Sequence, residues 1–353
     1  MAGDEILNKK KKMCIIDHYF HQKTNSFDFL YKILGDNYDV VNYWDYSPQN
    51  GPNVDIEIIN NFEYVFFFQV INPIRELNKI IAKIIWMPMY DGMEFNDAYW
   101  YRLSLLPIKV VCFSKKLYNY VKKFNIECIY LQYFIEPKKN LLNPDFGKKK
   151  IFFWYRGNIK PTTIMHLISE WEIDTFEIMN VPDPGFEPFS TAELNKFNCK
   201  FVLHDSFKSK QEFHDIIERN NIFIAPRIQE GIGMSFLEAL SMGRIIIAFD
   251  DSTMNEYIVD KVTGFLFNTN VNKKLSNNVS LEFVHKNCVE MASNGWSNWN
   301  QSIPFLLDFI KHTTINKKKR SILLIKYFIK YLYIDIFYKM RFYYKNKLKR
   351  LFK

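Results

Sequence analysis

The chain is predicted to be an α/β protein with two doubly wound parallel sheets. Apolar runs alternate with helical patterns along most of the sequence, and several runs are apolar on both faces, as in strands covered by helices on both sides. A polar segment with Pro, Gly and Lys at residues 137–149 divides the pattern into two halves. The 353 residues, 48% of them hydrophobic, suffice for two cores.

The first domain is expected over residues 13–136. Its clearest strand is EYVFFFQV at 63–70, while Pro73 suits the first turn of a helix and Ser114 is a candidate N-cap. Strands are predicted at 13–17, 38–44, 63–70, 84–87, 109–113 and 126–130. A helix is predicted at 72–80, and further helical patterns end near 34 and 124.

The second domain is expected over residues 150–295, after the linker at 137–149. Its strands are predicted at 150–154, 175–179, 200–203, 222–225 and 245–249. Outside the two domains we expect a flexible basic arm at 1–12 with no apolar signal-peptide core, a helix at 296–316, and a basic amphipathic tail at 317–353.

The most informative stretch is residues 227–267. Glu230, Gly231 and Gly233 form a turn before a predicted helix at 235–242, and Gly243 follows where a helix end favours positive φ. A glycine turn that leads into a helix N-terminus suits an anion such as phosphate.

Two carboxylates flank this turn. Glu238 follows Glu230 by eight residues, slightly over two helical turns, so both can face one side. Carboxylates accept hydrogen bonds from sugar hydroxyls. Phosphate donors between two hydroxyl acceptors predict a nucleotide-sugar site, whereas the alternative is an ordinary capped helix on a parallel sheet.

The string E-G-x-G-x-x-x-L-E-A-L-x-x-G, followed by N-E-Y-I and T-G-F-L-F, resembles the donor-site signature of family 4 retaining glycosyltransferases. The resemblance implies the GT-B fold, in which two Rossmann-like domains face a cleft, with 13–136 on the acceptor side and 150–295 binding the donor. It also implies that the helix at 296–316 crosses back to the first domain.

For the donor, the resemblance implies that Glu238 holds the ribose hydroxyls and Glu230 those of the sugar. Arg156 and Lys160 would grip the diphosphate, although Lys160 is one residue closer to Arg156 than is common and both could be surface charges. The residues expected to present backbone to the ligand are Gly231, Ile232, Gly233, Met234 and Ser235.

The predicted catalytic residues are Glu230, Asp91, Arg156 and Lys160. Asp91 follows a predicted strand where relatives carry a polar residue, and it could equally be a turn residue. His18 and His21, in the loop after the first strand, are candidate acceptor contacts or ordinary loop histidines.

Several positions depart from the family pattern or carry a structural expectation. Glu256 is expected to cap or orient a loop. Arg227 stands where relatives usually have Ser, and His204-Asp205 where a Gly is common, which leaves base and sugar open.

We expect no metal and no cofactor. The sequence has no Asp-x-Asp, the usual metal motif of GT-A glycosyltransferases, so Arg156, Lys160 and a helix dipole would stabilise the leaving diphosphate. Five scattered cysteines without metal-ligand spacing fit a reducing compartment.

Charge is concentrated at the end of the chain. Residues 317–353 hold 13 Lys and Arg and one acid, a net charge of +12, whereas the preceding residues carry −3 of the total +9. The basic positions on one helical face are Lys319, Lys326, Lys330, Arg341 and Lys345. This pattern favours an anionic membrane surface over a helix packed on the body or a nonspecific nucleic-acid contact.

We therefore expect a retaining, metal-independent hexosyltransferase that uses a nucleotide-sugar donor and a lipid-linked or polysaccharide acceptor. O-antigen, lipopolysaccharide or other surface polysaccharide is the expected product. No apolar run is long enough to span a membrane, so we expect a cytoplasmic protein at the inner face of the cell membrane, with no specific nucleic acid. The alternatives are a GT-B nucleotide-sugar epimerase and a non-enzymatic nucleic-acid binder.

Overall fold

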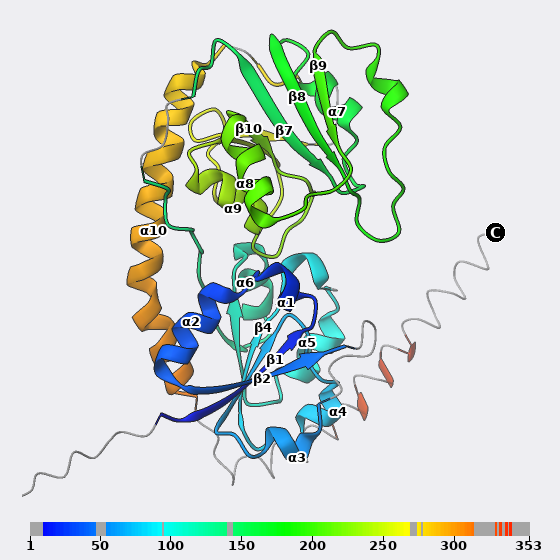
Figure 1. Ribbon diagram of the computed structural model, residues 1–353. Helices are drawn as coiled ribbons and strands as arrows, with labels where there is room; N and C mark the ends of the chain where they lie inside the picture. Colours follow the sequence, from blue (N-terminus) through cyan, green and yellow to red (C-terminus); the bar gives the residue numbers. More distant parts are fainter. Residues whose placement is uncertain are drawn as a thin grey trace, which may run out of the picture. The chain divides into compact units, whose positions relative to one another are not determined.

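The computed structural model describes residues 10–46, 54–93, 95–139, 144–268, 274–276 and 278–313, with helical positions 329, 332, 333, 336, 337, 339 and 340 (Figure 1). The chain divides into two compact units. Unit 1 comprises Met1–Cys112, Leu117–Tyr130 and Ile303–Lys353, and unit 2 comprises Phe113–Lys116 and Leu131–Ser302.

Unit 1 contains a six-stranded parallel sheet in the order β2-β1-β3-β4-β5-β6. Its strands are β1 (Lys12–His18), β2 (Asp39–Asp45), β3 (Tyr64–Phe68), β4 (Lys83–Met87), β5 (Ile108–Cys112) and β6 (Glu127–Tyr130). Its helices are α1 (His21–Thr24), α2 (Asp28–Asn37), α3 (Ile56–Ile59), α4 (Ile74–Leu77), η1 (Tyr90–Gly92), α5 (Asp97–Leu103) and most of α6 (Lys115–Lys122). The strand order reverses between β1 and β3.

Unit 2 contains a second six-stranded parallel sheet, in the order β12-β11-β10-β7-β8-β9. Its strands are β7 (Lys149–Tyr155), β8 (Ile173–Asn180), β9 (Lys200–His204), β10 (Ile222–Ile224), β11 (Ile245–Phe249) and β12 (Phe265–Phe267). Its helices are α7 (Pro161–Leu167), η2 (Thr191–Leu194), α8 (Lys210–Arg219), α9 (Met234–Ser241), η3 (Met254–Glu256) and the first part of α10 (Leu281–Lys311).

The strand order of unit 2 determines where a ligand can bind. Successive strands are added outward on one side from β7 to β9, and then on the other side from β10 to β12. The loops that leave β7 and β10 therefore run in opposite directions, and in open α/β sheets ligands bind at the carboxyl ends of such a strand pair. Arg156 follows β7 directly, and the turn with Glu230 follows β10.

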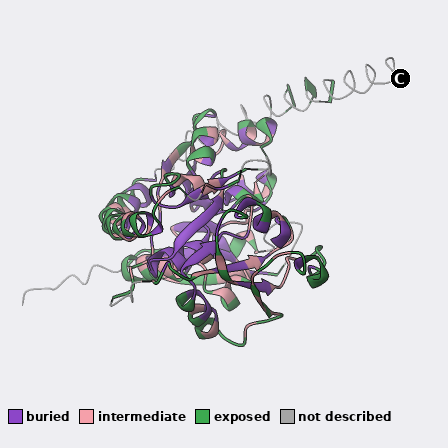
Figure 2. Ribbon diagram, turned by 90° about the horizontal axis from the view of Figure 1, so that it is seen from above, coloured by how far each residue is buried: buried purple, intermediate pink, exposed green. Residues whose placement is uncertain are grey.

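Each sheet is the centre of its own core. All five residues of β3 and of β5 are buried, as are all of β10. Figure 2 shows broad purple, buried strands in the interior and exposed green segments around them. Runs of Val, Ile and Phe form strands here because both faces are covered by apolar side chains of the flanking helices. In unit 2, α8 packs against β7, and α9 packs against β10 and β11 (Figure 1).

The α/β prediction with two parallel sheets is confirmed, and the strand at 245–249 was predicted to the residue. Three local expectations were wrong. His18 is the last residue of β1 and His21 the first of α1, rather than both lying in a loop. The helix predicted at 72–80 is limited to Ile74–Leu77, with Pro73 as its N-cap. The late helix begins at Leu281, not at 296, and continues through Pro304.

Most of the tail at 317–353 lies outside the described residues, including all five lysines and arginines placed on one face. Its described positions are helical and exposed. The exposed apolar ones are Ile329, Leu332, Tyr333, Ile336, Phe337 and Met340. Their spacing of three and four residues places them on one side of a helix. None of the described helices is both long enough and apolar enough to cross a membrane.

Candidate functional site

The turn after β10 leads into α9 through Gly233, a position where any other residue would be strained. Gly233 is the N-cap of α9 and has φ +82°, in the left-handed region. A Cβ built on it would lie 2.0 Å from the ring of Phe236. The amides of Phe236 and Leu237 donate to the Gly233 carbonyl, at 3.1 Å each. Gly243, with φ +69°, follows the helix as predicted.

A buried threonine, Thr253, holds the backbone of Glu230 and Gly231 in place. The Thr253 hydroxyl donates to the Glu230 carbonyl at 2.7 Å and to the Gly231 carbonyl at 3.2 Å. Glu230 itself is buried. A carboxylate on a turn held in this way is pre-oriented, so it loses little conformational entropy when it binds a ligand.

A charged cluster lies at the carboxyl ends of β7, β8 and β10. Arg156 Nε donates to Asp183 Oδ1 at 2.6 Å, and its Nη2 also contacts that oxygen. From the other side, Arg227 Nε donates to Asp183 Oδ2 at 3.0 Å and its Nη2 to Oδ1 at 2.9 Å. Arg227 Nη1 is 3.6 Å from Glu230 Oε2. Arg156, Asp183, Arg227 and Glu230 therefore form one alternating row of charges.

Burial and the neighbouring cation both act on Arg156. Burial, and after it the charge of Arg227, lower the pKa of the Arg156 guanidinium, while the Asp183 carboxylate acts in the opposite direction. The guanidinium also lies over the Trp154 ring, 4.3 Å from its centroid. Arginine remains charged under these influences because its ordinary pKa is so high. The cluster thus keeps two fixed positive charges close together.

The segment that carries Asp183 is attached to the end of β7. The Asp183 amide donates to the Arg156 carbonyl at 3.1 Å, and Trp154 Nε1 donates to the Val181 carbonyl at 2.9 Å. Gly157 has φ +111°, and a Cβ on it would lie 2.2 Å from the Phe186 ring. Gly157 is therefore required both for its backbone conformation and for the close approach of this segment.

Glu238 projects from α9 toward α8 and has basic neighbours there. Lys210 Nζ lies 3.2 Å from Glu238 Oε1, and His214 Nε2 lies 3.5 Å from Oε2. Only 13% of the Glu238 side chain is exposed. The two carboxylates of the sequence motif thus have different partners, Arg227 for Glu230 and Lys210 with His214 for Glu238.

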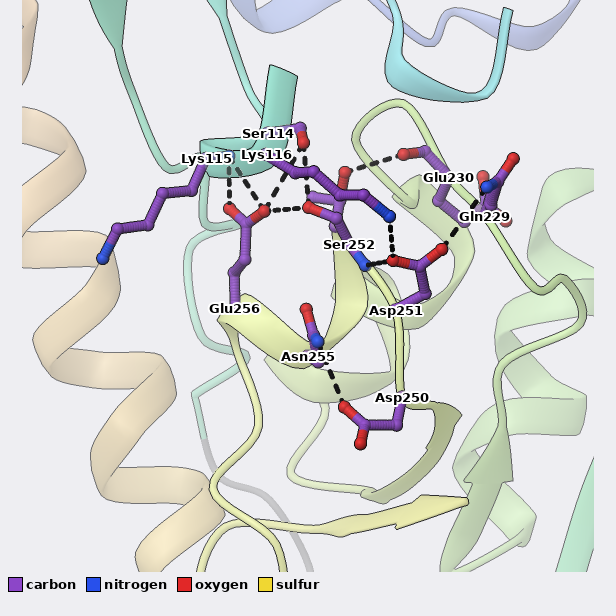
Figure 3. Close-up of polar contacts among 11 residues, drawn as sticks. Ser114, Lys115, Lys116, Gln229, Glu230, Asp250, Asp251, Ser252, Asn255 and Glu256 are labelled. Carbon is purple, nitrogen blue, oxygen red and sulfur yellow. Dashed lines mark hydrogen bonds and ion pairs between the residues drawn. The ribbon is translucent and has the colours of Figure 1, made fainter. Parts of the chain in front are cut away.

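Glu256 holds together a second polar cluster of unit 2 (Figure 3). Both of its carboxylate oxygens accept the Lys115 amide at 2.8 Å, and it accepts from the hydroxyls of Ser252 and Ser114 (Figure 3). Lys116 pairs with Asp251 at 2.7 Å. Glu256 thus caps the first turn of α6 and orients the loop after β11, the structural role expected from the sequence.

In unit 1 the histidine candidates surround a buried aspartate. Asp17 is 1% exposed; its Oδ1 lies 2.5 Å from His21 Nδ1 and accepts the His18 amide at 2.7 Å. The Tyr31 hydroxyl donates to Oδ2 at 2.9 Å, and burial, followed by the Asp17 charge, raises the pKa of Tyr31. Asp91 is exposed in the short turn η1 after β4. These three candidates lie at the carboxyl edge of the unit 1 sheet.

The two cations predicted to act together have different surroundings in the structure. Arg156 joins the charged cluster, but Lys160 is the exposed N-cap residue of α7, and its ammonium makes no ion pair with any described residue. Sequence reasoning noticed Arg227 only as a departure from the family pattern. It missed Asp183, Lys210 and His214, because no local pattern marks a residue whose partners lie on other strands. Among the described residues, no group of three or more His, Cys, Asp or Glu side chains is arranged to hold a metal ion.

Comparisons with known proteins agree with this geometry. Residues 189–294, which include α9 and β11, match the family model described as glycosyl transferases group 1. No curated protein sequence matches the chain significantly.

Solved structures resemble the whole fold. A glycosyltransferase from Rickettsia africae is 16% identical, with 88% of this chain and 100% of that chain covered and a TM-score of 0.61. Sucrose-phosphate synthase from Thermosynechococcus elongatus is 10% identical, with 86% of this chain and 100% of that chain covered and a TM-score of 0.59. Anabaena Alr3699/HepE, in complex with UDP and glucose, is 10% identical, with 84% of this chain and 99% of that chain covered and a TM-score of 0.52.

The chain thus has the GT-B fold of these glycosyltransferases, and residues 189–294 carry the group 1 match. Within that class, the matching segment carries Glu230, Glu238 and the glycine turn, while Arg156 and Asp183 precede it in the same unit.

Proposed function

We propose that the protein is a retaining, metal-independent glycosyltransferase that transfers a hexose from a nucleotide sugar. The observation that carries the proposal is the conjunction, at the strand-order reversal of unit 2, of a glycine turn before α9 with the charged row from Arg156 to Glu230. Backbone amides at the start of α9 and the Arg156 guanidinium suit a diphosphate.

The carboxylates suit the two ends of such a donor. Glu230 precedes the anion-binding turn, where sugar hydroxyls would donate to it. Glu238 follows the turn within α9, where ribose hydroxyls would donate to it. Gly231, Ile232, Gly233, Met234 and Ser235 would present backbone between them. The HepE structure, in complex with UDP and glucose, supports a nucleotide sugar as the donor class.

Metal independence rests on the cations of the chain itself. Departure of the nucleoside diphosphate leaves negative charge on the β-phosphate, and a fixed guanidinium stabilises that charge without reorganisation. Arg156 would supply this, with Lys160 as a further candidate on α7. For the acceptor side we propose His18 and His21 of unit 1. We propose Asp91, also of unit 1, as a catalytic residue that faces the donor sugar.

A donor screen tests the proposal. We expect UDP-, GDP-, ADP- or TDP-hexoses to raise the Tm of the full chain, and the stabilising donor to be turned over in EDTA when a glycan or lipid-linked acceptor is present. Proton NMR of the product should show the anomeric configuration of the donor sugar. Loss of turnover in EDTA with recovery on Mg²⁺ would refute metal independence, and an inverted product would refute retention. Free epimer formed without acceptor would identify a nucleotide-sugar epimerase instead.

The tail supports the membrane as the place where the enzyme meets its acceptor. Its exposed apolar positions lie on one helical side, and residues 317–353 carry a net charge of +12. An apolar face flanked by lysines suits the headgroup region of an anionic leaflet, at about 1 kcal/mol per basic residue. We therefore propose a lipid-linked acceptor in surface polysaccharide synthesis, of the O-antigen or lipopolysaccharide kind, at the inner face of the cell membrane.

Liposome sedimentation tests the tail. Full-length protein should sediment with phosphatidylglycerol vesicles and stay in solution with phosphatidylcholine vesicles, and deletion of 317–353 should abolish sedimentation without loss of turnover on a soluble acceptor. The double variant Ile336→Ser, Phe337→Ser keeps every charge and should bind less. Equal binding of the deletion variant would refute the assignment, and tail-dependent binding of an oligonucleotide in preference to the vesicles would favour a nucleic-acid contact.

A further inference from the structure

We propose that Arg227 is a second diphosphate-binding cation of the donor site and that Asp183 is the positioning residue that holds it beside Arg156. The inference rests on the proposed function, because it assigns roles within the same site. In the sequence, Arg227 departs from the family pattern, which usually has a serine at this position. The structure shows instead that its side chain joins the cation expected to grip the diphosphate.

The geometry of the two guanidinium groups supports this assignment. Asp183 contacts the same edge of both arginines, formed by Nε and Nη2, with Arg227 distances of 3.0 and 2.9 Å. A guanidinium has five N–H donors in a planar fork, so an edge held by a carboxylate leaves Nη1 to face elsewhere. For Arg227, Nη1 points toward Glu230, at 3.6 Å.

This position is the junction between phosphate and sugar. Arg227 stands between Arg156, which suits the diphosphate, and Glu230, which suits the sugar hydroxyls. In the transfer, the bond between the anomeric carbon and the β-phosphate oxygen breaks and its electron pair stays on that oxygen. The acceptor oxygen forms the new bond to the carbon, and its proton is released with the nucleoside diphosphate. A cation at the junction meets the oxygen on which charge develops.

The charge balance explains why a carboxylate is built into the site. Two guanidinium groups at this separation repel each other when both are partly withdrawn from water: the side chains are 21% exposed for Arg156 and 27% for Arg227. Asp183, at 19% exposure, offsets the repulsion between the two cations, and Glu230 faces Arg227 from the other side. Its backbone amide donates to the Arg156 carbonyl, which holds the segment after β8 at the end of β7.

Lys160 does not take this place. It is exposed at the start of α7, and its ammonium pairs with none of the described carboxylates. A flexible ammonium on four methylenes is also less pre-organised than a guanidinium fixed by two hydrogen bonds. We therefore assign the second phosphate contact to Arg227 rather than to Lys160.

Pyrophosphate binding to the full chain, followed by calorimetry, tests Arg227 without knowledge of the base. Arg227→Ser should raise the pyrophosphate Kd at least about tenfold, the loss expected for one charge-assisted hydrogen bond. Arg227→Lys keeps the charge but not the planar set of N–H donors, so its pyrophosphate Kd should lie between those of wild type and Arg227→Ser. Lys196→Ser, an equal loss of charge at an exposed position of the same unit, should bind like wild type. Equal Kd values for wild type and Arg227→Ser, or no binding by wild type, would overturn the assignment.

Asp183→Asn tests the positioning role. The asparagine amide has the shape of the carboxylate but turns an N–H donor toward one guanidinium. We therefore expect weaker pyrophosphate binding, measured well below the Tm of the variant. We also expect a higher donor KM with a smaller change in kcat. A merely structural role would lower Tm and leave the Kd of the folded protein unchanged. Tighter pyrophosphate binding by Asp183→Asn would show that Asp183 competes with the ligand, which refutes positioning.

The two proposals fail in different ways. If wild type turns over a nucleotide sugar and Arg227→Ser does so with the same KM and kcat, the inference is wrong and the glycosyltransferase proposal stands. If no nucleotide sugar binds but pyrophosphate binding still depends on Arg227 and Asp183, the anion site is real and the proposed donor is wrong.

Discussion

Replacing Gly233 by alanine isolates the backbone turn at the start of α9. The substitution adds one methyl group at a residue with φ +82°, and that methyl would lie 2.0 Å from the Phe236 ring. Phe236 is buried in the first turn of α9, so its ring cannot move into solvent to make room. The variant therefore combines a disfavoured backbone conformation with a steric conflict inside the core.

The two effects have separate magnitudes. A non-glycine residue in the left-handed region costs about 1–2 kcal/mol, and overpacking by one methyl group costs about 1–3 kcal/mol. We expect a loss of about 3 kcal/mol in the free energy of unfolding of unit 2, which corresponds to a fall in Tm of roughly 6–12 °C for a unit of this size. Donor binding should weaken as well, because the amides at the start of α9 shift with the turn.

Gly185 supplies the matched control for this prediction. It has φ +93° in the same unit, but a Cβ there would meet no atom within 4 Å. Gly185→Ala should therefore cost only the backbone component, about 1 kcal/mol or about 2–4 °C. Differential scanning fluorimetry of both variants measures the difference. If the two substitutions lower Tm equally, the conflict with Phe236 does not exist and the reasoning is wrong.

Three further predictions concern carboxylates and a histidine. Glu238→Gln should raise the donor Kd about tenfold in calorimetry, because an amide oxygen accepts a ribose hydroxyl without charge assistance; a change of twofold or less would remove Glu238 from the donor site. Asp17→Asn should lower the free energy of unfolding of unit 1 by about 1–3 kcal/mol in urea titration, since the carboxylate accepts from His21, Tyr31 and the His18 amide; an unchanged midpoint would contradict this. Burial lowers the pKa of His285 below 6.5, so the folded state binds its proton more weakly than the unfolded state. The stability contributed by neutral His285 is present above pH 6.5 and is lost as pH falls through the lower folded pKa; His285→Gln should flatten that part of the Tm–pH curve, and an identical curve would count against the linkage.

Local patterns were enough to predict the α/β class and most strands. Strands such as 63–70 and 245–249 are read from the sequence because apolar β-branched and aromatic runs have few alternatives to a buried strand. Element ends were less accurate. The helix at 72–80 shortened to Ile74–Leu77, because the amides of Lys79 and Ile80 bond to carbonyls three residues back rather than four. The last helix began earlier than predicted, at Leu281, because burial of Leu281 and Val284 extends it.

What the sequence determined by itself is the glycine turn, its helix and the positions of most strands along the chain, because these depend on conformational preferences of neighbouring residues. Gly233 and Gly243 have the positive φ values that their positions required. What only the tertiary structure decided is which charges meet. Asp183, Arg227 and Arg156 follow three different strands, and the sheet order β10-β7-β8 brings the ends of those strands together. A contact between residues so distant in sequence has no periodicity to reveal it, so the partner of Arg156 could be known only once the sheet was assembled.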